Sequence, residues 1–338
     1  MIERDEAMVR ILFLTDTHLR GTAPAARTDD FAAAVKAKLA EVVGIAEALG
    51  VDAVVHGGDL FDLPEPGVGQ VGEYLEILSR LPVPLYVVPG NHDVYGHNLS
   101  TLNRTLLGLL GRVGVVNVLV RGSAVIVKDG VRVRITAQGF HTEIDRRDLA
   151  WDYVVPPAAK DGCDYAVHVV HGMLLPRAEV SAAPFLPAAT AAEDVVALTG
   201  ADYTLAGHYH LPWEVRVGGK VALNPGALVR LSYDARELAR RPQVAVIEAD
   251  EKGIRHRYVP LSCARPGEEV FDTARVDADR AREEARAEFL ASLEAFGGGP
   301  HGVDPEDVLR ETMARMGVGP EVEAEVWERY QRARASVL

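Results

Sequence analysis

Long apolar runs and cysteines are scarce in this sequence of 338 residues. No stretch approaches the roughly 18 to 20 uninterrupted apolar residues that a membrane-spanning helix needs. The N-terminus, MIERDEAMVRILFL, is acidic where a secretory signal would be basic. These absences predict a cytoplasmic protein with no membrane partner. The two cysteines, Cys163 and Cys263, are far apart and outside any C-x-x-C pattern, which argues against a zinc or redox role for them.

Positive charge is also scarce, because 36 Lys and Arg residues face 49 Asp and Glu residues, for a formal net charge of -13. Proteins that coat nucleic acid nonspecifically depend on clustered Lys and Arg, so this balance argues against that class. An enzyme that acts on phosphates remains open, since bound divalent cations add positive charge that a formal count ignores. The hydrophobic content of 48% is ordinary for a globular protein with a sizeable core.

Short apolar runs alternate with helical patterns over the first ninety or so residues. We predict strands at 9–14, 52–56 and 85–88, with helices at 29–49 and 69–80 between them. This order is typical of parallel crossover units, whose ligands gather beyond the carboxyl ends of the strands. Further on, Asp129-Gly130 between two β-rich runs predicts a hairpin. More strands are expected at 165–170, 203–206, 214–217, 221–223, 244–248 and 254–261, which favours two stacked sheets with helices outside.

After about residue 265 the composition shifts to Ala, Glu and Arg. Helices are predicted at 278–296, from 305 onward behind Asp304-Pro305, and at 321–336. We therefore divide the chain into a catalytic domain, residues 8–262, and a helical C-terminal extension, residues 263–338, which acts as a cap or docks a partner. Its apolar stripes fit either a packing face or a partner anchor: Leu290, Leu293 and Phe296 in one, and Val318, Val322, Val326 and Trp327 in the other.

Five short polar blocks follow predicted strands. They are Asp16-Thr17-His18, Gly58-Asp59-Leu60-Phe61-Asp62, Gly90-Asn91-His92-Asp93, His171-Gly172 and Gly207-His208-Tyr209-His210. A phosphoester hydrolase must neutralise nonbridging oxygens and supply hydroxide at neutral pH, and two metal ions about 3.5 to 4 Å apart do both. Carboxylate and imidazole ligands without thiolates suit manganese, iron or zinc. We expect two divalent metal ions, with manganese favoured and iron, zinc and magnesium left open.

These blocks resemble the calcineurin-like metallophosphoesterase superfamily, whose pattern is D-x-H, G-D-x-x-D, G-N-H-D, H and G-H-x-H. The resemblance covers residues 8–261 and implies an α/β fold, a βαββα-type sandwich of two sheets flanked by helices. It implies that one metal ion is held by Asp16, His18, Asp59 and His210, and the second by Asp59, Asn91, His171 and His208. It also implies that His92 contacts the scissile phosphate and donates a proton to the leaving oxygen, with Asp93 orienting that imidazole.

Three features favour the branch of SbcD-like DNA-repair nucleases. They are the block at 58–62, the segment Leu223-Asn224-Pro225-Gly226-Ala227, and the helical extension, although the extension is short and acidic for a DNA-contacting cap and fits partner docking better. We therefore expect a phosphodiesterase acting on DNA ends, an exonuclease or endonuclease subunit of the SbcD type. Its implied partner is an SbcC-type coiled-coil ATPase, and a homodimer is left open. The alternatives are a phosphodiesterase for small or cyclic nucleotides and a noncatalytic metal-binding scaffold for an ATPase.

Several other residues leave alternatives open. His168 lies three residues before His171, which is favoured as the ligand because it ends the apolar run and precedes Gly172. Contacts with a ligand residue or with substrate stay open for His56, His97 and His141, with packing or surface roles as the default. Asp62 is expected to orient a ligand or a loop rather than to touch metal.

Overall fold

The structure is a computed structural model that describes residues 8–24, 27–182, 188–272 and 305–335, with 274 and 282 as single positions. The chain divides into two compact units, residues 1–272 and residues 273–338. The helix expected at 278–296, with Leu290, Leu293 and Phe296, lies outside the described residues. None of the described helices is long and apolar enough to cross a lipid bilayer.

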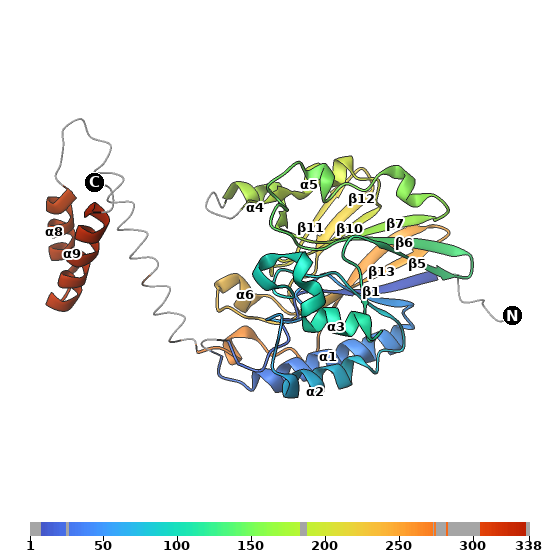
Figure 1. The fold of residues 1–338 in the computed structure, drawn as a ribbon, viewed down its shortest axis with the longest axis horizontal. Helices are drawn as coiled ribbons and strands as arrows, with labels where there is room; N and C mark the ends of the chain where they lie inside the picture. Colours follow the sequence, from blue (N-terminus) through green and yellow to red (C-terminus); the bar gives the residue numbers. More distant parts are fainter. Residues whose placement is uncertain are drawn as a thin grey trace. The chain divides into compact units, whose positions relative to one another are not determined.

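The first unit contains two six-stranded sheets that lie face to face (Figure 1). The first sheet has the order β14-β13-β1-β2-β3-β4. Its strands are β1 (Met8–Leu14), β2 (Ala53–His56), β3 (Leu85–Val87), β4 (Asn117–Val118), β13 (Gln243–Asp250) and β14 (Gly253–Pro260). Strands β1 to β4 are parallel, whereas β13 pairs antiparallel with both β1 and β14. The N-terminal strand therefore lies inside the sheet, with Met8 opposite Asp250.

The second sheet has the order β11-β12-β10-β7-β6-β5. Its strands are β5 (Ser123–Lys128), β6 (Val131–Gln138), β7 (Tyr165–His171), β10 (Tyr203–Gly207), β11 (Trp213–Val217) and β12 (Lys220–Asn224). The four inner strands are parallel and the two edge strands antiparallel. In the β5–β6 hairpin Asp129 and Gly130 both have positive φ, as the Asp-Gly pair predicts. A separate parallel pair joins β8 (Leu174–Leu175) to β9 (Thr190–Ala191).

Helices cover the outer face of each sheet (Figure 1). The α-helices of the first unit are α1 (Phe31–Leu49), α2 (Val68–Leu78), α3 (Leu106–Arg112), α4 (Arg177–Ala182), α5 (Ala192–Leu198) and α6 (Ala235–Ala239). Its short 3-10 helices are η1 (Tyr95–His97), η2 (Leu99–Arg104), η3 (Leu149–Trp151), η4 (Pro157–Lys160) and η5 (Gly267–Glu269). Helix α1 begins at the Asp30 cap and ends at Gly50, which is left-handed.

Alternate side chains along β1 belong to two different hydrophobic cores. Ile11 and Phe13 belong to the core between the two sheets, whereas Leu12 and Leu14 belong to the core beneath α1 and α2. Successive side chains of a strand point to opposite faces, so a strand buried on both sides is apolar throughout. The sandwich of two sheets flanked by helices that the sequence predicts is confirmed.

In the second unit the structure describes α8 (Pro305–Met316) and α9 (Pro320–Ala335). Leu309 and Met313, one turn apart on α8, are buried. The Arg310 guanidinium lies 5.6 Å from the ring centroid of Trp327 on α9. Val322 is exposed. The helices expected near the C-terminus are therefore present, and one of their apolar side chains faces solvent.

Candidate metal centre

The five polar blocks meet where the strands of the two sheets end. Asp16 and His18 follow β1, Asp59 follows β2, and Asn91 and His92 follow β3 in the first sheet; His171 ends β7, and His208 and His210 follow β10 in the second. Backbone bonds fasten these loops to each other, because the amide of Asp16 donates to the carbonyl of Gly58 at 3.0 Å, and the amide of His18 to that of Asp59 at 3.0 Å. The convergence is thus a property of the two-sheet topology.

Three groups of three residues bring their ligand atoms within 4.8 Å of one another: Asp16, His18 and His210; Asp59, His171 and His208; and His18, Asp62 and His92. Oδ2 of Asp59 lies 3.4 Å from Nε2 of His171 and 3.7 Å from Nε2 of His18, so this carboxylate stands between the first two groups. Oδ1 of Asn91 lies 3.1 Å from Nε2 of His171. The structure therefore brings all seven expected ligands together.

The donor atoms of this cluster suit divalent cations. Nδ1 of His171 lies 2.8 Å from the carbonyl oxygen of Gly57, which can only accept, so Nδ1 carries the proton and Nε2 keeps its lone pair. Nδ1 of His18 faces Oδ1 of Asp62 at 3.3 Å. Carboxylate, amide and imidazole donors without sulfur favour a transition-metal cation such as manganese, iron or zinc. The residues fit a pair of such ions.

Burial makes positive charge necessary at this site. Asp16 and Asp59 are both buried, and burial raises the pKa of Asp16. Burial opposes ionisation of Asp59 as well, but His171 and His18 hold the pKa of its carboxyl well below its usual range. In return Asp59 and Asp16 overcome the effect of burial and raise the pKa of His171 to about 9. Buried carboxylates need a cationic partner, and metal ions would take the place of that imidazole proton.

The backbone of the cluster is strained. Asp16, His18, Asp59 and His208 have positive φ values of 51°, 41°, 52° and 86°. Non-glycine residues rarely adopt this left-handed region, and in folded proteins such strain concentrates at functional sites. Only three other non-glycine residues among those described share it, so the strain is gathered at the metal ligands.

Two glycines of the polar blocks are required by close contacts. A Cβ on Gly90 would lie 2.1 Å from Oδ1 of Asp59 and 2.3 Å from its amide nitrogen. A Cβ on Gly58, which has φ of 110°, would lie 2.1 Å from Nδ1 of His171. No side chain fits in either place, so the glycines that precede Asp59 and Asn91 allow their loops to touch the ligands.

Residues 9–212, more than half of the chain, match the family model described as calcineurin-like phosphoesterase. The chain belongs to the calcineurin-like phosphoesterase family. The description of this family, a phosphoesterase, agrees with the chemistry that the polar blocks indicate.

The relatives of this calcineurin-like phosphoesterase include DNA double-strand break repair proteins named Mre11. That of Methanosarcina mazei is 29% identical over 280 residues, which cover 80% of this chain and 40% of that protein. That of Haloferax volcanii is 30% identical over 238 residues, which cover 68% of this chain and 48% of that protein. The chain thus spans less than half the length of these two relatives. A solved archaeal phosphodiesterase is 15% identical to this chain, and the match covers 75% of this chain and all of that one, at a TM-score of 0.36.

His92 of this calcineurin-like phosphoesterase is partly exposed beside the cluster, its ring centroid 4.8 Å from that of His18. Its Nδ1 lies 2.9 Å from the carbonyl oxygen of Asp62 and must donate to it, which leaves Nε2 free for a substrate. Asp62, expected to orient a ligand or a loop, contacts both of these imidazoles.

Asp93 was expected to orient the imidazole of His92, and its contacts in the structure are with backbone amides. The buried Asp93 carboxylate accepts hydrogen bonds from the backbone amides of Phe61 at 2.9 Å and Gly90 at 2.8 Å, with a longer one of 3.3 Å from Leu60. It therefore joins the loop after β2 to the loop after β3. The physical reason is that the amides of these turns have no partner in a sheet, and a carboxylate can satisfy several at once.

The sequence pattern gave little indication that two residues, His56 and Thr17, bond to each other and to the loop that carries Asp59. Nε2 of His56 lies 3.0 Å from Oγ1 of Thr17, and Nδ1 of His56 accepts from the amide of Gly58 at 3.2 Å. Oγ1 of Thr17 donates in turn to the carbonyl oxygen of Leu60 at 2.9 Å. Burial lowers the pKa of His56 to about 3, so the imidazole stays neutral. In the sequence, the position of Thr17 between the expected ligands Asp16 and His18 was the indication of these contacts.

The remaining candidate histidines lie outside the cluster. His168 is in the interior, 2.9 Å from Oγ1 of Thr136, and His141 contacts Asp152 at 2.9 Å. His97 lies at a cavity of about 240 Å³ that reaches His208. Between them stands Phe140, whose ring centroid is 5.7 Å from that of His97 and 5.5 Å from that of His208. Nothing in the sequence pattern singled out Phe140.

Proposed function

We propose that this protein is a manganese-dependent phosphodiesterase that acts on DNA ends, a nuclease subunit of the SbcD type. The observation that carries phosphoester hydrolysis is the convergence of two carboxylates, one amide and four imidazoles on one buried point between the sheets. DNA as the substrate is supported by the similarity to proteins named DNA double-strand break repair protein Mre11 over 80% and 68% of the chain.

In this proposal Asp16, His18 and His210 hold one cation, Asn91, His171 and His208 hold the other, and Asp59 is shared. When bound, two divalent cations neutralise phosphate oxygens and make a nucleophilic hydroxide available at neutral pH. The protein orients these ligands through Gly57, Asp62 and Thr17. His92, with Nδ1 held by the Asp62 carbonyl, carries on Nε2 the proton that the leaving sugar oxygen needs.

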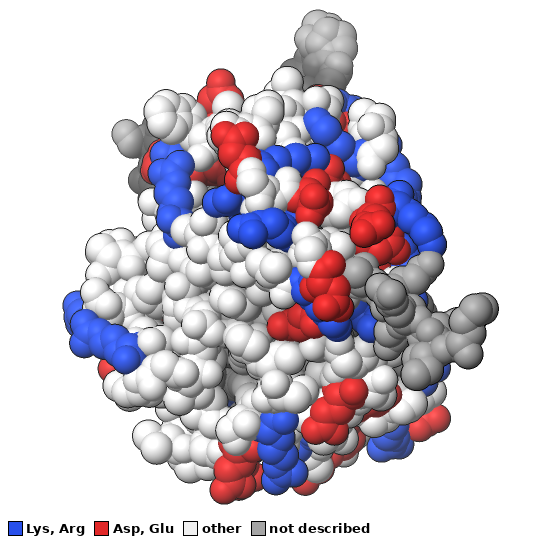
Figure 2. All heavy atoms as spheres, turned by 90° about the vertical axis from the view of Figure 1, so that its right-hand side faces the viewer, with Lys and Arg blue, Asp and Glu red and all other residues white. Residues whose placement is uncertain are grey.

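One face of the molecule bears on how the protein would hold DNA. Figure 2 shows one face of the molecule, on which Lys and Arg residues are interspersed with Asp and Glu residues around a broad uncharged area. On that face the described residues form no continuous basic track, which is the usual feature of nonspecific DNA binding. Bound cations would then supply much of the positive charge that neutralises the phosphate of a substrate.

A second candidate function is hydrolysis of small or cyclic nucleotides, and one observation favours it. The cavity of about 240 Å³ beside His208 has Phe140 as an aromatic wall and Arg146 among its lining residues. Such a space suits one nucleoside stacked on an aromatic ring. The noncatalytic scaffold is disfavoured because all the ligand types are in place.

Hydrolysis of bis-p-nitrophenyl phosphate with manganese tests the reaction. We expect activity in the full-length protein and its loss in Asn91→Ala and His210→Ala, and inactivity with every divalent metal would restore the scaffold alternative. Linear DNA and cyclic nucleotides, compared at equal concentration, test the substrate. Release of nucleotides from DNA supports the nuclease, whereas turnover of cyclic nucleotides alone would replace it by the second candidate.

The C-terminal extension completes the proposal. We propose that it docks a coiled-coil ATPase of the SbcC type, supported by α8 and α9, on which Val322 is exposed. Exposed apolar residues on a paired helix suit a helical partner. Co-purification of such an ATPase with the full chain, but not with a Val322→Glu variant, tests this docking.

A further inference from the structure

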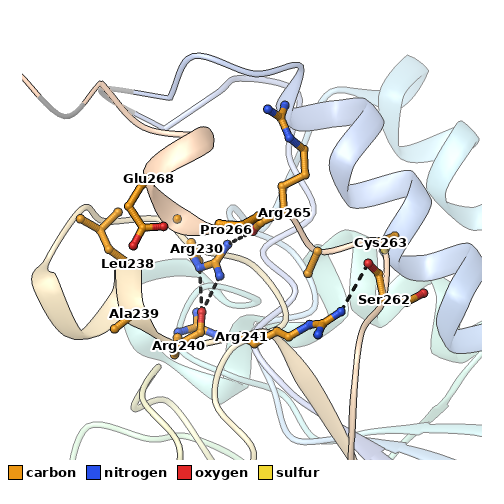
Figure 3. Close-up of a pocket in the computed structure, with 12 residues that line it drawn as sticks. Arg230, Leu238, Ala239, Arg240, Arg241, Ser262, Cys263, Arg265, Pro266 and Glu268 are labelled. Carbon is orange, nitrogen blue, oxygen red and sulfur yellow. Dashed lines mark hydrogen bonds between the residues drawn. The ribbon is translucent and has the colours of Figure 1, made fainter.

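A second candidate binding site lies in the first unit, apart from the polar blocks. It is a cavity of about 500 Å³ with four arginines in its lining, Arg230, Arg240, Arg241 and Arg265, against one carboxylate, Glu268 (Figure 3). An adjoining cavity of about 300 Å³ shares Arg230 and Arg265 and adds the cations Lys38 and Arg27 and the carboxylates Asp29 and Asp30. Positive charge is therefore concentrated here in a chain whose net charge is -13.

Three of these six cations have a carboxylate partner. Nε of Arg240 lies 2.7 Å from Oε1 of Glu237, and Nε of Arg265 lies 3.2 Å from Oε2 of Glu269. Arg27 is paired with Asp29 at 2.7 Å. Their charges are thus compensated inside the protein and leave the cavity little net attraction for an anion.

Arg230 and Lys38 differ, because their charge is buried without a counter-ion. Arg230 is 3% and Lys38 is 4% exposed, and neither forms an ion pair within the described part of the chain. Nζ of Lys38 donates to the carbonyl oxygen of Leu228 at 3.0 Å. Burial is the main cause that lowers the pKa of Lys38 to about 7, and Arg27, Arg230 and Arg240 are further causes.

The guanidinium of Arg230 has donors to spare. Its Nη1 donates to the carbonyl oxygen of Arg265 at 2.8 Å, and its Nε and Nη2 both donate to that of Arg240 (Figure 3). A guanidinium has five N–H hydrogens, so two remain without a partner among the described residues. Figure 3 shows this guanidinium in the midst of the lining residues, with the side chain of Arg265 directed away from it.

We propose that this cavity binds an anion of the phosphate class through the free N–H groups of Arg230, with Arg241 at the exposed rim and Lys38 behind. Arginine pairs with phosphate through two parallel hydrogen bonds, and a buried charge gains most from such a partner. Glu268 opposes an anion, but as an exposed side chain its charge is screened by solvent. The site does not depend on the proposed nuclease activity, since it shares no residue with the metal centre.

The anion has two sources with the same chemistry, a free phosphate or phosphate monoester and a phosphodiester of a nucleic-acid strand. Titration calorimetry on the full-length protein, with manganese bound and again after chelation, measures inorganic phosphate directly. Because the metal ions would bind phosphate too, the site assigned here is the one that survives chelation. A single-stranded oligonucleotide without terminal phosphate, added as competitor, identifies the strand as the source if it displaces phosphate and the free dianion if it does not.

Arg230→Gln is expected to weaken phosphate binding by about tenfold or more, the value of a charge-assisted hydrogen bond. Since this change could also unfold the protein, Arg241→Ala at the exposed rim serves as a second variant, with an expected weakening of about threefold to tenfold. The matched control is Arg236→Gln, which lies outside both cavities and should bind as the wild type does. The proposal is overturned if the chelated protein shows no saturable phosphate binding, or if Arg241→Ala and folded Arg230→Gln both bind phosphate as tightly as the control.

Discussion

Nη1 of Arg240 donates a hydrogen bond of 2.6 Å to the carbonyl oxygen of Ala227, whose own amide donates to the carbonyl oxygen of His210 at 2.9 Å. Arg240 also donates to the carbonyl of Val229 at 2.7 Å. Residues 225–230 are buried but belong to no strand, so side-chain cations satisfy carbonyls that a sheet would otherwise satisfy. Arg240 thus stabilises the backbone that bonds to His210, and it contacts no side chain of the expected ligands.

Replacing Arg240 by Met is expected to lower the free energy of unfolding by about 3–5 kcal/mol, because it leaves Glu237 buried without its cation. Urea denaturation measures the change. Arg236→Ala on the same helix is the control: its partner Glu179 is at the surface, so the loss should be about 1 kcal/mol or less. Equal losses in the two variants would contradict the supporting role of Arg240.

Gly90→Ala is expected to abolish metal binding, since the new methyl group would lie 2.1 Å from Oδ1 of Asp59. Metal content after gel filtration measures the outcome. Gly72→Ala, inside α2 with open space around it, should bind metal normally and stabilise the fold by about 0.5–1 kcal/mol. Retention of two metal ions by Gly90→Ala would show that the loops are not in contact as described.

His92→Gln is expected to lower turnover by roughly two to four orders of magnitude, the usual size of a general acid's contribution, while metal content stays unchanged. The reason is that Gln can still donate to the Asp62 carbonyl but cannot supply a proton. Substrates with better leaving groups should lose less, because they need less protonation. A variant that loses metal as well as turnover would assign His92 a ligand role instead.

Lys38 predicts a pH dependence of stability. Its folded pKa is about 7 and its ordinary value about 10.5, so between these values the unfolded chain binds a proton that the folded chain lacks. The free energy of unfolding should therefore rise with pH across this window, by up to about 1.4 kcal/mol per unit. Burial raises the pKa of the neighbouring Cys263 thiol to about 12, above this window.

Lys38→Met should remove this slope, which urea denaturation at pH 7.5, 8.5 and 9.5 would measure in both proteins. The wild type is expected to gain stability over this interval relative to the variant. If the free energies of unfolding of the two proteins changed in parallel with pH, Lys38 would keep its proton over the whole interval. Its hydrogen bond to the Leu228 carbonyl could not explain that result alone.

The sequence was most informative at positions where residue types that bind metal directly follow a predicted strand. Strand β1, helix α1 and the hairpin at Asp129-Gly130 are read from patterns a few residues long. The seven ligands could be proposed because residue type and position after a strand both indicate metal chemistry. Their convergence follows from the order of the strands.

What could not be predicted depends on pairs that are distant in the sequence. Asp93 and Phe61, or Arg240 and Ala227, form single contacts with no periodic signal, and each depends on how two loops meet after folding. A charged residue near a motif suggests a chemical role, so Asp93 was assigned to catalysis although its work is to join two turns.

The position of β1 between β2 and β13 also has a consequence for how the chain reaches its native state. During synthesis β1 emerges first, yet its antiparallel partner, opposite Met8 at Asp250, emerges after every metal ligand. Until then an apolar strand has an open edge, which favours slow folding and association between chains. A fragment that stops at residue 212, where the match to the family model ends, would contain all seven expected ligands and still leave β1 unpaired on one side.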